Sequence, residues 1–318
     1  MSLLSRYLTN AYSAELSKRV TPNGFRLADV IRSGRRYPDS LIGIYAPDFQ
    51  SYGVFHELFD HIVESFQAPS LTHRTDLACI NPAAVVSTRI RVARNLAGHV
   101  FPAGMSKAER IRVEEKITHA CRSLAPHFDG STAQFGDIPA SQLDAMISER
   151  LAFGPHDKYM AAAGIHADWP AGRSVFNTHN RQLSIWINEE DHLRVALVLP
   201  GASAAACHAL MRQVMSLLAA QLDFCEDPQL GYLTSCPSNV GCAMRASFRV
   251  DLRLDTSQQA LLERLEAAGL IQVRSAQGEH SPRAGGLVDV SFGNRVGISE
   301  TQMLRDMELL FAMQELPA

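Results

Sequence analysis

The chain has 318 residues, 46% of them hydrophobic, and a formal net charge of −3. This length favours about two domains, and the near-neutral charge gives no support for a nucleic-acid or membrane-surface role. No run approaches the ~20 apolar residues of a membrane span, and the N-terminus lacks the layout of a secretion signal, so we expect a cytoplasmic protein. The six cysteines include no close-spaced pair, which predicts neither a zinc site nor a disulfide framework.

The N-terminal part of the sequence is predicted to be helical. Residues 2–33 and 54–66 carry apolar residues at helical spacing. The segment 37–53 between them is rich in Pro, Gly and Asp and is predicted to be a loop, which either binds a ligand or only connects the helices. Residues 67–82 have no periodicity, and we place a domain boundary near residue 75. This divides the chain into a small domain, 1–75, and a larger domain, 76–318.

The segment 87–95, STRIRVARN, has the alternation of a strand. Arg89 and Arg91 lie two residues apart and therefore face the same way, whereas Ile90 and Val92 face the other way. Two arginines on one face of a strand can bind an anion. An exposed strand that happens to carry basic residues has the same pattern.

The remaining elements alternate between helices and strands. Ser106 and Glu109 form a capping box before a helix over 106–124. A short helix is predicted over 141–151, and an Ala-, Leu- and Met-rich helix over 202–222. A last helix over 299–315 carries a methionine stripe that is typical of core packing. Strands are predicted within 174–187, 195–199, 231–252 and 287–292.

Two polar segments stand out among these elements. In 231–252 a turn separates two strands and carries Cys236, which is either a buried thiol or a cleft thiol that nearby arginines and a hydroxyl keep as thiolate. The segment 273–286 contains Arg274 and Glu279 and is predicted to be a mobile loop that closes over a ligand, although a solvated loop has the same composition.

The sequence WINEEDHLR, residues 186–194, follows a strand and places Glu189, Glu190 and Asp191 in a row. A solvated acidic loop is the simpler interpretation. Adjacent carboxylates repel each other, however, unless a cation neutralises them. The cluster therefore indicates a site for Mg²⁺ or a guanidinium group.

Several arginines on separate elements, separated carboxylates and one turn cysteine fit phosphoryl transfer, which needs cations for the phosphates and carboxylates to orient the acceptor. No Walker loop or dinucleotide fingerprint is present. Nearly end to end, the chain resembles the phosphagen kinases, the family of arginine and creatine kinases. The matching segments are LSRYLT, LADVIRSG, IGIYAPD, SYGVFHELFD, STRIRVARN, WINEEDHLR, GYLTSCPSNVG, RASF and VRSAQGEH.

The resemblance implies an α+β fold, with a small all-helical N-terminal domain and a larger domain in which helices flank an antiparallel sheet. It also implies transfer of the γ-phosphoryl group of ATP to a guanidinium, with ATP or ADP and Mg²⁺ as cofactors. No nucleic-acid or membrane partner is expected.

Site residues follow from the resemblance position by position. Nucleotide contacts are implied for Ser87, Thr88, Arg89, Ile90, Arg91, Asn177, Arg194, Arg245, Ala246, Ser247, Phe248, Arg249, Arg274, Ser275, Ala276, Gln277, Gly278 and Glu279. Acceptor contacts are implied for Ser40, Leu41, Ile42, Tyr45, Glu190, Cys236 and Glu279, and catalytic roles for Glu190, Glu279, Cys236 and Arg194. Glu190 is the expected base, Cys236 a thiolate assisted by Ser238, and Glu189 and Asp191 orient waters on Mg²⁺.

Departures from the family pattern leave the acceptor and the nucleotide contacts open. The short loop and Tyr45 favour arginine, whereas Leu41 replaces a glycine of arginine kinases and favours another guanidine such as taurocyamine. Asn177 and Arg249 replace histidines, and residues 275–277 replace Gly, Thr and Arg. These changes predict altered base contacts or, alternatively, a nucleotide-binding relative with weak catalysis. The small domain with its YAPD loop, which bacterial protein-arginine kinases lack, argues for a free small-molecule acceptor.

Overall fold

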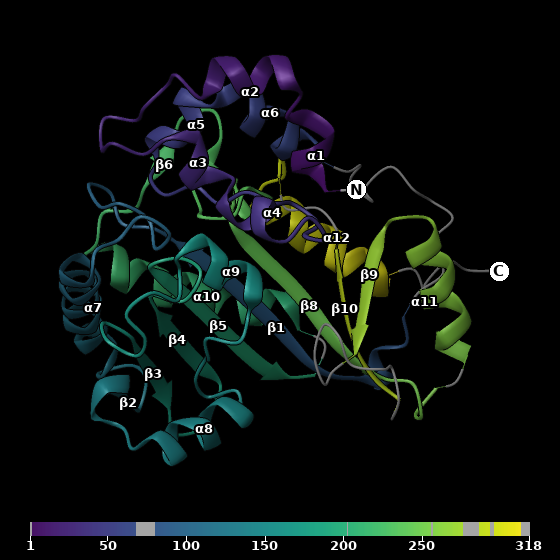
Figure 1. Ribbon diagram of the computed structural model, residues 1–318. Coiled ribbons are helices and arrows are strands. Elements are labelled where there is room, and N and C mark those ends of the chain that lie inside the picture. Colours follow the sequence, from purple (N-terminus) through teal and green to yellow (C-terminus); the bar gives the residue numbers. More distant parts are fainter. Residues whose placement is uncertain are drawn as a thin grey trace.

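The computed structural model describes residues 2–67, 80–201, 203–255, 257–275, 286–292 and 296–312. Short helices form an N-terminal unit that lies against a larger unit, an eight-stranded antiparallel sheet flanked by helices (Figure 1). This confirms the predicted α+β fold. The domain boundary predicted near residue 75 lies outside the described residues.

Local capping and one apolar stripe explain the N-terminal unit. The side chains of Ser2 and Thr9 accept hydrogen bonds from backbone N–H groups in the first turns of α1 and α2. In α6, Leu58 and Ile62 lie one turn apart, and both are buried in a small apolar core. The helices are α1 Leu3–Tyr7, α2 Asn10–Leu16, α3 Leu27–Val30, α4 Arg32–Arg36, α5 Gln50–Val54 and α6 His56–Glu64.

A buried carboxylate holds the loop between α4 and α5. Asp48 has no exposed surface and accepts hydrogen bonds from the hydroxyls of Thr21 and Ser51. Two residues earlier, the N–H of Ala46 donates to the carbonyl of Ser235 at 2.7 Å. The loop of the small unit is therefore fixed directly beside the turn that carries Cys236.

The sheet has the order β2-β3-β4-β5-β1-β8-β10-β9, and every neighbouring pair is antiparallel. β1, the STRIRVARN strand, lies in the middle between β5 and β8 (Figure 1). The strands are β1 Val85–Arg94, β2 Gly130–Gln134, β3 Ser174–Thr178, β4 Leu183–Ile187, β5 Leu193–Pro200, β8 Met244–Asp251, β9 Ile271–Ser275 and β10 Leu287–Phe292, with a separate ribbon of β6 Glu226–Asp227 and β7 Gly231–Tyr232.

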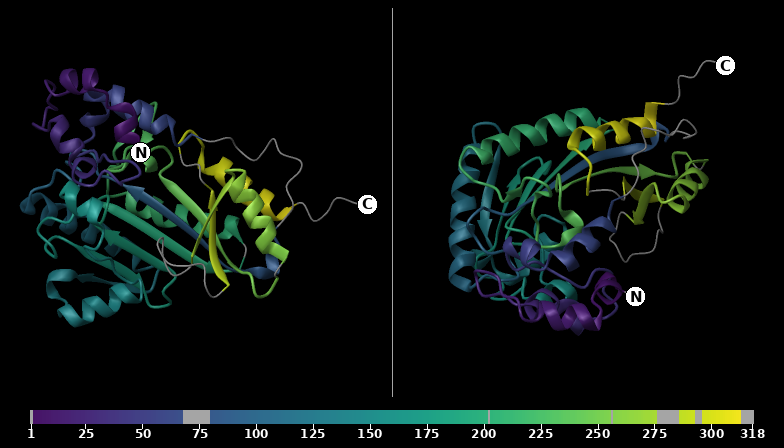
Figure 2. Two further views of the ribbon diagram at one scale, coloured as in Figure 1. Left: turned by 45° about the vertical axis from the view of Figure 1, so that its right-hand side comes forward. Right: turned by 90° about the horizontal axis from the view of Figure 1, so that it is seen from above.

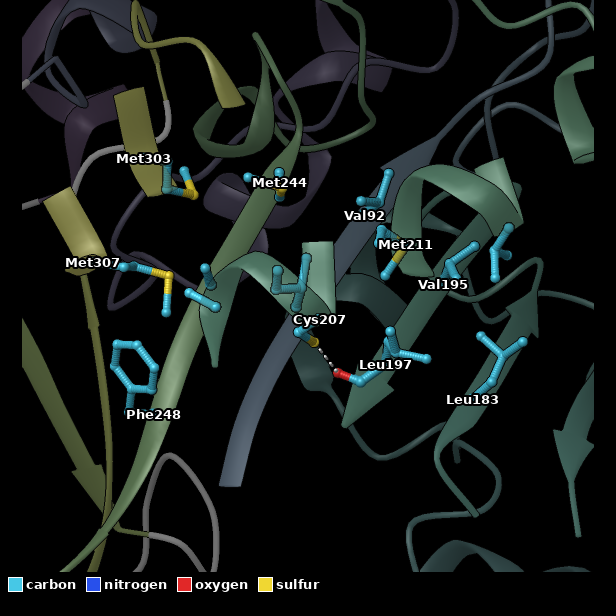
Figure 3. Close-up of a cluster of buried hydrophobic side chains, with 14 of the residues drawn as sticks. Val92, Leu183, Val195, Leu197, Cys207, Met211, Met244, Phe248, Met303 and Met307 are labelled. Atoms are coloured by element: carbon cyan, nitrogen blue, oxygen red, sulfur yellow. Dashed lines mark hydrogen bonds between the residues drawn. The ribbon is translucent and has the colours of Figure 1, made fainter. Parts of the chain in front are cut away.

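Strand alternation gives the sheet two different faces. Viewed from above, α10 and α12 lie along one face and the N-terminal helices lie on the opposite side (Figure 2). The helix-covered face is apolar: Val92, Leu197 and Phe248 pack there against Met211 and Met307 (Figure 3). The polar residues at the alternate strand positions therefore point to the other face.

The larger unit contains elements that the sequence analysis did not predict. The alternating region 174–187 is a hairpin of the two strands β3 and β4, and β2, β9, α9 and α11 were not predicted. The helices are α7 Lys107–Cys121, α8 Ala140–Ser148, α9 Lys158–Ala163, α10 Ala204–Ala219, α11 Ser257–Ala267 and α12 Glu300–Ala312, with 3₁₀ turns at Pro82–Ala84, Arg122–Leu124, Phe135–Asp137 and Pro237–Asn239. None of the helices in the described part of the chain has the length and apolar character needed to traverse a bilayer.

Candidate active site

The polar face of the sheet forms the floor of a cavity of about 700 Å³. The loop 40–45 of the small unit, the turn 236–239 and helix α9 complete its walls. α4 and α9 lie side by side above the sheet (Figure 1), and Lys158 of α9 forms a 2.6 Å ion pair with Asp39 at the start of the loop. The cavity thus lies where the two units meet.

Five arginines from four strands line this cavity. Arg91 of β1 is directly opposite Arg245 of β8. Arg89 lies two residues before Arg91 on β1 and therefore points to the same face. Arg194 comes from β5 and Arg274 from β9. Strand alternation explains the grouping, because each of these positions points to the polar face. The structure therefore brings together five of the six arginines that were predicted to contact the nucleotide; the sixth, Arg249, does not line the cavity.

Arg89 has the strongest requirement for an anion. It forms no hydrogen bond or ion pair with another described residue, and its Nε is buried without a partner. Burial, and then the charge of Arg194, lower the pKa of Arg89 to about 10. A half-buried cation among other cations is costly unless an anion neutralises it. The floor of the cavity is therefore suited to bind phosphates.

Arg194 is held in place by two neighbours on the same face of the sheet. Its Nη1 donates to Oε1 of Glu189 at 2.8 Å, and its Cζ lies 4.6 Å from the ring centroid of Trp186. The ion pair and the cation–π contact fix the guanidinium plane. Glu189 is consequently engaged by a protein cation, which leaves one carboxylate oxygen to accept from the N–H of Glu190 at 3.0 Å.

Glu190 lines the cavity as a poorly solvated carboxyl group. Burial, followed by the charges of Asp191 and Glu189, raises the pKa of Glu190 to about 8. The amide Nδ2 of Asn239 donates to its Oε2 at 3.2 Å. A carboxyl group in this position gains from a cation beside it and has a pKa close to neutral pH, which is the range that suits a general base.

Asp191 has a structural role in this loop. It is 2% exposed, and its Oδ1 accepts from Nδ2 of Asn95 at 2.7 Å and from the N–H of Ser235 at 2.6 Å. These bonds join the acidic turn to the end of β1 and to the Cys236 turn. The neighbouring His192 is fully buried, and burial lowers its pKa to about 3, so it is a neutral structural residue.

Removing the side chain of Asp191 is therefore expected to destabilise the fold. Asp191→Ala leaves the buried N–H of Ser235 without this acceptor and Nδ2 of Asn95 with only the carbonyl of Leu233, and should lower the free energy of unfolding by about 1–3 kcal/mol. Asp191→Asn keeps an acceptor oxygen and should lose less. Urea unfolding of both variants checks this, and equal stability of the alanine variant and the wild type would show that the two hydrogen bonds have no structural role.

Cys236 lines the cavity but does not have the predicted thiolate character. Burial and then the charge of Glu190 raise the pKa of Cys236 to about 12, and the 3.2 Å contact between its Sγ and Oγ of Ser238 offsets this only in part. The prediction that arginines favour the thiolate was wrong, because the nearest charges are carboxylates. The thiol is neutral unless a cation comes to lie beside it.

The loop 40–45 forms one wall of the cavity. Ser40, Leu41, Ile42 and Tyr45 all line it, and Leu41 is 72% exposed. Among the described residues we find no acceptor for the backbone N–H groups of Leu41, Ile42 and Gly43. Burial and then the charge of Glu190 raise the pKa of Tyr45 well above its ordinary value, so its hydroxyl stays protonated.

Several residues that were expected to bind the nucleotide do not reach the cavity with their side chains. Thr88, Ile90, Ala246 and Phe248 point to the apolar face, where the last three belong to the core. Their place on central strands commits their backbones to the sheet. We therefore correct the prediction: the side chains of these four residues do not line the cavity, whereas Ser247, at an alternate position of β8, does.

Three further predicted contacts lie beside the cavity instead of lining it: Ser87, Asn177 and Arg249. Nδ2 of Asn177 donates to the carbonyl of Leu151 at 2.8 Å. Arg249 forms a two-bond ion pair with Asp289, with Nε–Oδ1 at 2.8 Å and Nη2–Oδ2 at 3.1 Å. Ser275 lines the cavity as predicted, whereas Ala276, Gln277, Gly278 and Glu279 lie outside the described residues.

The sequence analysis also missed residues that line the cavity. Helix α9 contributes Asp157, its N-cap, together with Tyr159 and Met160. Asp157 before a short apolar run and the left-handed Gly164 at its end were the available indications of this helix. Gln272 and Arg274 alternate with buried Ile271 and Val273 in β9, a pattern that the loop prediction overlooked. Arg150, Asp289 and Ser291 also line the cavity.

The donor set fits Mg²⁺ held chiefly by a nucleotide. The residues that the structure describes contain no cluster of three or more His, Cys, Asp or Glu side chains able to hold a metal ion. Mg²⁺ keeps several waters and commonly binds through substrate phosphates with one or two carboxylates. Glu189 lies at the cavity wall beside Arg194, whereas Oδ1 of Asp191 is committed to protein donors.

Comparison with known proteins places this site in an enzyme class. A family model for the ATP:guanido phosphotransferase C-terminal catalytic domain matches residues 112–312, and one for the N-terminal domain matches residues 1–64. The chain belongs to the ATP:guanido phosphotransferase family, the phosphagen kinases, which transfer a phosphoryl group to a guanidino nitrogen.

Curated relatives of the chain include several arginine kinases. The chain is 31% identical to the arginine kinase of Schistocerca americana, and the alignment covers 96% of this chain and 90% of the relative. It is 33% identical to that of Anthopleura japonica, where 96% of this chain aligns with only 45% of the relative. The chain thus spans about half the length of the Anthopleura japonica protein.

Solved structures of two other phosphagen kinases share the fold. A lombricine kinase superimposes with a TM-score of 0.86 at 28% identity, covering 97% of this chain and 89% of that one. The duplicated taurocyamine kinase from Schistosoma mansoni superimposes with a TM-score of 0.84 at 27% identity, covering 98% of this chain and 46% of that one. The relatives therefore differ in the guanidino compound after which they are named.

Proposed function

We propose that this chain catalyses reversible transfer of the γ-phosphoryl group of ATP to the guanidinium group of free arginine. The observation that carries the proposal is the cavity itself. It has a cationic floor that includes Arg89, which has no counter-ion among the described residues, and a half-buried carboxyl group, Glu190, which gains from a cation. A triphosphate and a guanidinium complement these two ends.

In the proposed reaction the five arginines hold the phosphate chain while Glu190 and Glu279 orient the acceptor. A guanidinium nitrogen attacks the γ-phosphorus, a P–N bond forms, and the bond to the ADP oxygen breaks. The attacking nitrogen loses a proton, which Glu190 accepts. Bound Mg²⁺ would neutralise phosphate charge, and Glu189 would help to hold it by orienting its waters. Charge compensation and alignment supply most of the rate enhancement.

Cys236 has a supporting role in this proposal. A guanidinium beside its Sγ would lower the pKa of the thiol, because an opposite charge favours the thiolate. The sulfur would then pair with a nitrogen that does not react. The thiolate therefore forms together with acceptor binding.

Arginine is the proposed acceptor because of the loop of the small unit. The N–H groups of Leu41, Ile42 and Gly43, which have no acceptor in the described part of the chain, can bind the carboxylate of an amino acid, as they form a short run of donors at the cavity wall. The names of the curated relatives agree with this choice. We also retain the prediction of a cytoplasmic location.

A second acceptor is favoured by Leu41. Its exposed side chain lies where it can narrow the space for a long substrate, and related solved structures are named after lombricine and taurocyamine. A nucleotide-binding relative with weak catalysis is the third possibility, suggested by Asn177 and Arg249. ATP binding without transfer to any guanidine would support it.

A panel assay distinguishes these acceptors. Purified chain with MgATP and arginine, taurocyamine, lombricine, glycocyamine or creatine should produce ADP fastest with arginine. Leu41→Gly should raise kcat/KM for arginine about threefold to tenfold if the side chain narrows the pocket, since one misplaced apolar group is worth about 1–3 kcal/mol at most. Faster ADP production with another compound would reject arginine as the preferred acceptor. A Leu41→Gly variant with unchanged acceptor preference would show that Leu41 does not determine specificity.

A further inference from the structure

Arg150 lines the cavity from an unexpected position. It follows α8, which lies beside β2 and β3 (Figure 1), and its backbone has a φ of 61°. This is the left-handed region, which glycine or asparagine usually occupies at the end of a helix. An arginine here costs backbone strain, which points to a use for its side chain.

The turn that carries Arg150 is held from several directions. On one side Asn177 of β3 donates to the carbonyl of Leu151 at 2.8 Å, and Arg181 of the same hairpin forms a 3.0 Å ion pair with Glu149. Three residues after Arg150, Phe153 is buried, with its ring 5.5 Å from that of Trp186 in the cavity wall. The backbone of the Arg150 turn is therefore held beside the cavity, and the exposed side chain of Arg150 extends from it.

The charge of Arg150 is available for a ligand. It forms no ion pair with any carboxylate in the described part of the chain. It is also close enough to Arg89 to contribute to the lowered pKa of Arg89. Arg249 is on the same side of the cavity but is neutralised by Asp289. Arg150 thus extends the cationic floor toward its rim.

We propose that Arg150 binds the phosphate chain of the nucleotide and that Asn177 is a positioning residue that acts through the Arg150 turn. The inference rests on the proposed function, because it assigns residues to the nucleotide end of the same cavity. It gives Asn177 a role without contact to the nucleotide: the side chain that replaces a family histidine orients an additional cation.

The test is calorimetric titration of the full chain with MgATP. Arg150→Gly removes the cation at a backbone conformation that glycine adopts without strain, so the fold should be retained. We expect its affinity for MgATP to fall about tenfold, in line with the loss of one hydrogen bond to a charged group. Arg150→Lys should retain part of the affinity. The KM for the guanidino acceptor should not change.

Asn177→Ala tests the positioning role. It should weaken MgATP binding in the wild-type background and have no further effect in the Arg150→Gly background, because both changes act through one contact. Arg253→Ala is the matched control, since this exposed arginine pairs with Asp251 and does not line the cavity; it should bind MgATP like the wild type.

Each failure has a separate meaning. An Arg150→Gly chain that binds MgATP as tightly as the wild type overturns the proposed contact and leaves the proposed function intact. An Asn177→Ala effect that persists in the Arg150→Gly background overturns the positioning role. A wild-type chain that binds no MgATP overturns the proposed function and this inference together.

Discussion

Replacing Glu190 with glutamine is expected to lower turnover by about two orders of magnitude or more, as for the loss of a positioned general base. The shape of the side chain and its contact with Asn239 are largely kept. The acceptor should also bind more weakly, because the variant offers no negative charge to the guanidinium. Steady-state kinetics with MgATP and arginine measures both effects, and a fully active variant would show that Glu190 is not the base.

The same substitution should stabilise the chain at alkaline pH. Burial and the charges of Asp191 and Glu189 raise the pKa of Glu190 from 4.5 to about 8, so ionisation of Glu190 costs free energy in the folded state. Below pH 4.5 the group is protonated in both states and makes no difference. Between pH 4.5 and 8 the wild type progressively loses stability that the glutamine variant retains.

Thermal unfolding without substrate checks this prediction. The melting temperature of Glu190→Gln should exceed that of the wild type at pH 8–9, and the difference should disappear near pH 4. A glutamine variant that is less stable than the wild type at pH 8 would mean that Glu190 makes favourable ionic contacts. Loss of activity with a gain in stability is the combination expected for a residue retained for function.

Replacing Arg89 with methionine is expected to have the second large effect. Methionine fills similar space without the charge. The phosphates therefore lose a cation that is not paired with any other described residue. MgATP affinity should fall about 30- to 100-fold, in keeping with two lost charge-assisted hydrogen bonds. Turnover should fall by about two orders of magnitude as well, because in the proposed reaction Arg89 stabilises the charge that develops on the phosphoryl group.

Arg249 provides the matched control for Arg89 on the neighbouring strand. Arg89→Met removes a poorly solvated cation that has no partner among the described residues, and it should leave stability unchanged or raise it by about 1 kcal/mol. Arg249→Met leaves Asp289 without its partner and should lower stability. MgATP calorimetry and urea unfolding of both variants separate the two roles. If Arg89→Met binds MgATP as the wild type does, the cationic floor is not the phosphate site.

The fold was predictable where local pattern and tertiary context agree. The alternation in STRIRVARN predicted a strand that is central in the sheet, and Ser106 with Glu109 predicted the start of α7 correctly. Helix α9 was missed because six residues are too few to show a clear period. β9 was missed because polar residues of this strand line the cavity. A strand with polar residues beside a polar segment has the same composition as a loop.

The candidate site was predictable to the level of residue types but not of their charge states. Strand alternation correctly assigned Arg89 and Arg91 to one face of the sheet. The family resemblance, applied position by position, also implied nucleotide contacts for Ile90 and Phe248, whose side chains face the core. The protonation of Cys236 depends on which charges surround it in space. Sequence reasoning counted the arginines near it along the chain, while the fold places Glu190 beside it.

The most direct measurement of the proposed transfer uses ATP labelled in the γ-phosphoryl group. Incubated with the wild-type chain, Mg²⁺ and arginine, the label should move to arginine in a P–N bond that acid hydrolyses, and the Glu190→Gln chain should move about a hundredth as much or less in the same time. Label that remains on ATP or appears only as inorganic phosphate with every guanidine tested would contradict phosphoryl transfer between the two ends of this cavity.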